Sequence, residues 1–75
     1  MQTSVFSEYM AALLKHSLKL DGNLQTHSDF VELQQIEARI TNARNNGYFG
    51  GDQARALTSI AADLHKDYMA ALKLG

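Results

Sequence analysis

Apolar residues recur at helical spacing in three segments of this chain, and nowhere do they alternate with polar residues over the length of a strand. Two clusters of glycine and small polar residues, over 21–28 and 45–52, separate the segments. Such clusters end helices and form turns. The pattern therefore predicts an all-α, three-helix domain spanning the whole chain, with helices near 4–20, 28–46 and 52–74. We expect the second and third helices to form an antiparallel hairpin and the first to pack across it.

The second and third segments each carry one apolar stripe. In the second, a narrow seam is spaced by three and four residues, as in a coiled coil, and consists of Leu33, Ile36, Ile40 and Ala43. The stripe of the third segment is roughly 120° wide and consists of Leu57, Ile60, Ala61, Leu64, Tyr68, Ala71 and Leu72. We expect these two stripes to face each other and to form the core of the hairpin.

Capping residues support these helix boundaries. The N-cap candidates are Ser4 in the first helix, Thr26, Ser28 or Asp29 in the second, and Asp52 in the third. Both Thr26 with Asp29 and Asp29 with Glu32 have the spacing of a capping box. Gly47 follows the second helix, where a left-handed residue is needed. Lys73 is expected in the last turn of the third helix, where a cation suits the helix dipole.

The first segment is more apolar than a surface helix requires. Its apolar residues cover roughly 220° of the helix circumference, and its charged residues occupy a strip of roughly 40°. One hairpin partner cannot cover so wide an arc, so the helix either lies inside a larger bundle or offers part of its face to another chain. The residues expected to bind a protein partner are Phe6, Met10, Leu14 and Leu18.

Self-association would cover this face without a second protein. A chain of 75 residues buries little of its surface and is marginally stable alone, and two-fold dimers are the commonest oligomers. We therefore expect a homodimer or a higher oligomer with Met10, Leu14 and Leu18 at the contact. His16 lies inside the apolar arc and is expected near the edge of this contact, as a hydrogen-bonded residue or as a pH-sensitive one.

Tyr48 and Phe49 are adjacent aromatic residues in the second turn. They either fold back onto the helix ends, as the hydrophobic contact of a C-cap, or point outward and anchor a protein partner. The first alternative predicts partial burial of both rings. The second adds both residues to the protein-binding surface.

Composition and motifs argue against several classes of function. The formal net charge is −1 and there is no cysteine, so the chain has no general attraction to nucleic acid, no disulfide and no cysteine-based zinc site. The three histidines lack metal-binding spacing, and no nucleophile elbow, phosphate-binding glycine loop or convergent pair of carboxylates is present. We therefore expect no enzyme activity, no cofactor and no bound metal.

Three helices are also the framework of a helix-turn-helix domain, in which the third helix would contact DNA through Arg55, Lys66 and Lys73. The connection before that helix is longer than the usual turn, and acidic residues lie beside the basic ones, so nucleic-acid binding is the second choice.

No segment has the apolar length of a signal peptide or membrane span, and we expect a cytoplasmic protein without membrane contact. The sequence predicts a small protein–protein interaction module (regulator, inhibitor, adaptor or assembly subunit) acting through the first helix.

Overall fold

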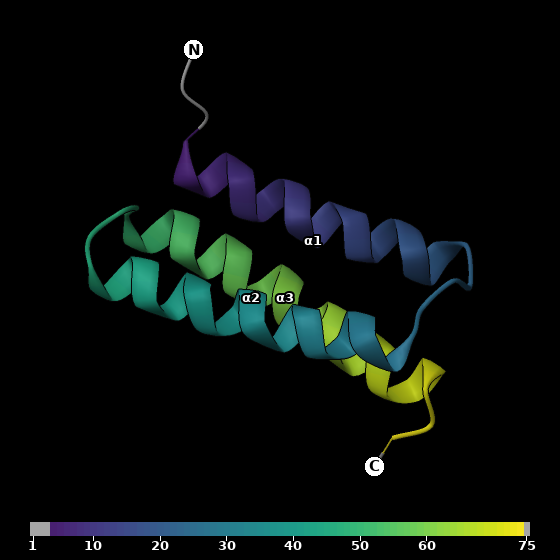
Figure 1. The fold of residues 1–75 in the computed structure, drawn as a ribbon. Coiled ribbons are helices and arrows are strands. Elements are labelled where there is room, and N and C mark those ends of the chain that lie inside the picture. Colours follow the sequence, from purple (N-terminus) through teal and green to yellow (C-terminus); the bar gives the residue numbers. More distant parts are fainter. Residues whose placement is uncertain (1–3, 75) are drawn as a thin grey trace.

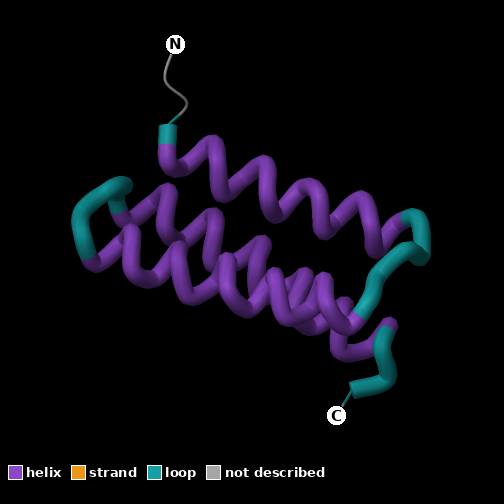
Figure 2. The backbone as a smooth tube through the Cα atoms, viewed as in Figure 1, coloured by secondary structure: helices purple, strands orange, loops and turns teal. Residues whose placement is uncertain are grey.

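The computed structural model describes residues 4–74, which form three α-helices: α1 (Val5–Asp21), α2 (His27–Asn45) and α3 (Gly51–Ala71). Figures 1 and 2 show α2 and α3 as an antiparallel hairpin, with α1 lying against it, antiparallel to α2 and parallel to α3. Within the described residues there is no strand. The predicted all-α, three-helix architecture is confirmed, and every predicted boundary lies within three residues of the observed helix end.

The first two helices begin at side-chain caps. At α1, the Ser4 hydroxyl accepts a hydrogen bond from the Ser7 backbone N–H at 3.1 Å. At α2, the Thr26 hydroxyl accepts from the Asp29 N–H at 3.1 Å, and the Asp29 carboxylate accepts from the Thr26 N–H at 3.0 Å. This reciprocal capping box satisfies two N–H groups that the helix cannot pair internally. Of the three candidates for the α2 cap, the structure selects Thr26.

Helix α3 begins differently from the prediction. Asp52 was the expected N-cap, but the helix begins earlier, at Gly51, and Gly50 occupies the N-cap without a side-chain hydrogen bond. Asp52 lies instead in the first turn. The assignment of Asp52 as the cap is therefore wrong, although its carboxylate still lies near the positive end of the helix dipole.

All three helices end in the same Schellman turn, which contains one left-handed residue followed by an N–H that bonds to the carbonyl five residues earlier. The left-handed residues are Asn23 (φ 57°), Gly47 (φ 76°) and Lys73 (φ 58°). The prediction for Gly47 is confirmed. The prediction for Lys73 is wrong, because α3 ends at Ala71 and Lys73 lies beyond the last helical turn.

The hydrophobic core lies between the three helices. Its buried members are Leu13 of α1, Leu33, Ile36, Ile40 and Ala43 of α2, Phe49 of the loop, and Ala54, Leu57, Ala61, Leu64 and Tyr68 of α3. Ile60 and Ala71 were predicted in this core but are exposed, Ile60 by 36%. His65 and Ile60 lie on opposite edges of the α3 stripe, about 140° apart: the edge of His65 contacts Glu37 of α2, whereas the edge of Ile60 is left uncovered.

The wide apolar arc of α1 is explained in part by its position against both helices of the hairpin. Most of its apolar side chains pack against the core, namely Val5, Phe6, Tyr9, Met10, Ala12 and Leu20. Leu14 and Leu18 do not, and they remain 57% and 62% exposed. Among residues 4–74, no helix combines the length and the apolar character needed to cross a membrane.

Candidate functional site

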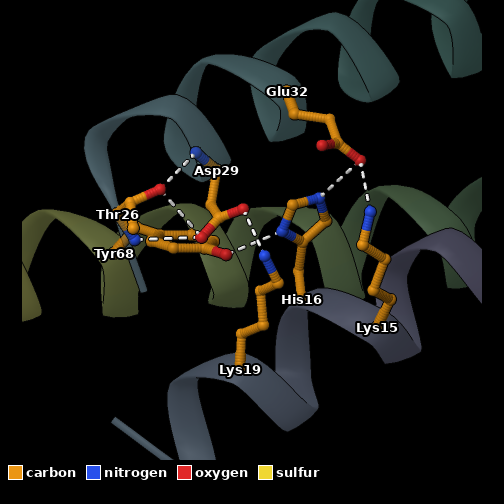
Figure 3. A network of polar contacts seen from close by, with 7 residues as sticks. All are labelled: Lys15, His16, Lys19, Thr26, Asp29, Glu32 and Tyr68. Atoms are coloured by element: carbon orange, nitrogen blue, oxygen red, sulfur yellow. Dashed lines mark hydrogen bonds and ion pairs between the residues drawn. The ribbon is translucent and has the colours of Figure 1, made fainter. Parts of the chain in front are cut away.

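A buried polar pair lies where α1 meets α3 (Figure 3). His16 and Tyr68 are both fully buried, and His16 Nδ1 lies 2.6 Å from the Tyr68 hydroxyl oxygen. With Nδ1 accepting from this hydroxyl, the proton of a neutral ring lies on Nε2. Nε2 lies 3.4 Å from Glu32 Oε1 on α2 but makes no hydrogen bond, so the histidine bonds to α3 and lies beside a carboxylate of α2.

Two ion pairs fasten the adjacent flank of α1 to α2. Lys15 Nζ lies 3.1 Å from Glu32 Oε1, and Lys19 Nζ lies 2.7 Å from Asp29 Oδ1. The hydrogen bond from Lys19 lowers the pKa of Asp29, and the hydrogen bond from Lys15 lowers the pKa of Glu32. Both carboxylates therefore stay charged at neutral pH, and the pairs fix the rotation of α1 about its own axis.

The Tyr68 hydroxyl is a hydrogen-bond donor in this environment. Burial, together with the nearby charges of Asp29 and Glu32, raises the pKa of Tyr68 to about 12. The hydroxyl therefore keeps its proton over the physiological pH range and lies out of reach of solvent. We assign this cluster a structural task, which is to hold α1 in one orientation.

That orientation presents a continuous row of α1 to solvent. Lys15 and Lys19 immediately follow Leu14 and Leu18, and successive helical residues are about 100° apart. When the lysines face α2, the leucines point away from the hairpin. The exposed row has spacing of four, three and four, and we call it the outer face of α1: Ser7, Ala11, Leu14 and Leu18.

Of the four residues predicted to bind a protein partner through the first helix, two are on this surface. Leu14 and Leu18 belong to the outer face, whereas Phe6 and Met10 are half-buried and pack against the core. His16 was expected near the edge of an intermolecular contact, and this is wrong. Two residues along a helix correspond to about 200°, so His16 lies nearly opposite Leu18, inside the protein.

The two aromatic residues of the second turn behave differently from each other. Phe49 is only 8% exposed, and its ring packs edge-on against Tyr9 at a centroid distance of 6.4 Å. Phe49 therefore folds inward, as the first alternative expected, and does not point outward as an anchor would. Tyr48 is 65% exposed, so the expectation that it is partly buried is wrong. Tyr48 lines an open cleft of about 410 Å³ beside Glu8 and Arg39.

The three basic residues considered for DNA binding are exposed but do not form one helical row. Arg55 and Lys66 lie on α3, and Lys73 belongs to the turn after it. The exposed acidic residues Asp63 and Asp67 lie on the same helix close to Lys66. This surface therefore carries mixed charge.

Sequence reasoning missed the polar contacts between helices. Besides the pairs above, His65 Nδ1 lies 2.9 Å from Glu37 Oε1, and the Phe30 ring packs edge-on against His65. The sequence contained one signal of these contacts. Two lysines, Lys15 and Lys19, are one turn apart on the first helix, and two acids, Asp29 and Glu32, are one turn apart on the second.

Within residues 4–74, no group of three or more His, Asp or Glu side chains is placed to hold a metal ion. Comparison with protein-family models, with curated proteins and with solved structures finds no match to this chain.

Proposed function

We propose that this protein is a non-enzymatic interaction module that binds an apolar helix of a protein partner along the outer face of α1. The observation that supports the proposal is the pair Leu14 and Leu18, four residues apart and both more than half exposed. Two leucines one turn apart on a helix form a stripe that an apolar groove or a second helix can cover.

The contacts that hold α1 against the hairpin support the proposal. A binding helix that is already held in place loses less conformational entropy on association than a mobile one. Here the buried His16 holds α1 on the side opposite the leucines, and the Lys15–Glu32 and Lys19–Asp29 ion pairs hold it along one flank. The buried contact of α1 is therefore opposite its binding surface, and the ion pairs that orient the helix lie beside that surface.

Other exposed apolar residues serve as a comparison. Val31 is 52% exposed on α2, close to the value for Leu14, but its neighbours at one helical turn are polar: His27, Ser28, Gln34 and Gln35. Isolated apolar side chains of this kind are common on protein surfaces and imply nothing about binding. Val31 is therefore the matched control for Leu14.

Photo-crosslinking tests the proposal. A benzophenone amino acid replaces Leu14 in one variant and Val31 in another, and each variant is irradiated in the cells from which the chain comes. We expect discrete protein adducts from position 14 at clearly higher yield than from position 31. Equal yields from the two positions would contradict the proposal, because exposure alone would then explain the crosslinks.

A further inference from the structure

We infer that the partner of the outer face is a second copy of this chain, docked with its α1 antiparallel to the first. The inference rests on the proposed function and names its partner. It starts from an asymmetry within the outer face. Ser7 and Ala11 occupy the N-terminal half, and Leu14 and Leu18 occupy the C-terminal half, with all four side chains exposed.

The spacing of this row gives the layers of an antiparallel pair. Intervals of four, three and four are those of the a and d positions of a coiled coil. A two-fold antiparallel arrangement places Leu18 of one copy against Ser7 of the other, and Leu14 against Ala11. Each layer then joins one large and one small side chain, which allows close packing of the helices. A parallel arrangement would pair the small residues with each other and leave space between them.

The charges beside the row favour the same arrangement. Glu8 and Lys15 lie on one flank of the outer face, about 70–90° from its centre, and Met10 and Ser17 lie on the other. A two-fold antiparallel pair brings like flanks together, so Lys15 of each copy lies beside Glu8 of the other. A parallel pair would place Lys15 beside uncharged residues.

Both charged groups are able to make this contact. Glu8 is exposed and makes no ion pair within the described part of the chain. Lys15 already bonds to Glu32, but its ammonium group carries three hydrogens and its side chain is about half exposed. The contact therefore adds two ion pairs to the dimer without breaking the one that orients α1.

Disulfide trapping tests this arrangement directly. The natural chain has no cysteine, so introduced thiols react only with each other. The test uses the double variant Ser7→Cys/Leu18→Cys and the two single variants, each oxidised mildly at micromolar concentration. In the antiparallel register, positions 7 and 18 of opposite copies face each other. The two copies of position 7 are about 16 Å apart along the helix axis, far beyond the reach of a disulfide.

We expect a covalent dimer from the double variant and essentially none from either single variant. Within one chain, positions 7 and 18 are also about 16 Å apart, so an intramolecular bond cannot compete. Efficient crosslinking of a single variant would overturn the antiparallel register, because it would place equivalent residues together.

A reversible measurement covers the case in which the cysteine variants perturb packing. Sedimentation of the unmodified chain should show a dimer at micromolar concentration. Leu14→Glu should weaken this association at least ~100-fold, because the two-fold dimer contains the layer of Leu14 against Ala11 twice and both copies lose the leucine. Val31→Glu should leave association unchanged. A monomeric wild-type chain at every concentration would overturn the inference. Photo-crosslinks from position 14 to a different protein would in that case still support the proposed function.

Discussion

Replacing Tyr68 with phenylalanine removes one hydroxyl from the core and tests the polar pair that holds α1. The ring still fills its site, so the loss concerns the 2.6 Å hydrogen bond to His16. His16 Nδ1 would be left fully buried without a partner, which costs ~1–3 kcal/mol. A domain of 75 residues is stable by roughly 4–11 kcal/mol. The melting temperature should therefore fall by roughly 5–20 °C.

The matched experiment is a double-mutant cycle followed by circular dichroism during urea unfolding. His16→Leu alone leaves the Tyr68 hydroxyl unpaired and should also destabilise the protein. The double variant removes both polar partners and should lose at least ~1 kcal/mol less than the sum of the single losses. Tyr9→Phe is the control, because the Tyr9 hydroxyl makes no hydrogen bond within residues 4–74. Additive losses would refute the claim that the two side chains stabilise each other.

Three further predictions concern the hairpin, a turn and an ion pair. Ile40→Ala, at a position 2% exposed, should cost ~2–5 kcal/mol in urea unfolding; an unchanged transition would mean that the seam is misplaced. Asn23→Gly should raise stability by up to ~1 kcal/mol by relieving a left-handed residue, whereas Asn46→Gly, at φ −94°, should not. The depressed pKa of Asp29 contributes stability above pH 3.8 that is lost as pH falls through its folded-state pKa. Lys19→Met should therefore destabilise the protein at neutral pH and make little difference well below pH 3.8, and a constant difference across this range would contradict the pairing.

Local features of the fold were predictable from the chain because they depend on neighbours in sequence. The 3–4 spacing of Leu33, Ile36 and Ile40 located the buried side of α2, and Gly47 marked its end. Ile60 shows the limit of this approach, because its exposure depends on where α1 crosses the hairpin. A wide stripe on one helix does not show which of its edges a third helix will leave uncovered.

The candidate site was predictable only in part for the same reason. Leu14 and Leu18 were expected on the binding face together with Phe6 and Met10, and of these four only the two leucines are exposed. His16 belonged to the same arc, but its partner Tyr68 is 52 residues away, and only the packing of α1 on α3 brings them together. Likewise, nothing local distinguishes Tyr48 from Phe49, since Phe49 is buried by its contact with Tyr9 of α1, a residue distant in sequence.

The two ends of α1 are attached to the hairpin by forces that respond differently to the solvent. Near its N-terminus the contact is aromatic, between Tyr9 and Phe49. Toward its C-terminus the partly exposed pairs of Lys15 and Lys19 contribute. Added salt screens such charges and slightly strengthens apolar contacts. High ionic strength should consequently speed amide hydrogen exchange in the last turns of α1 more than in its first turns, so that the helix opens from its C-terminal end.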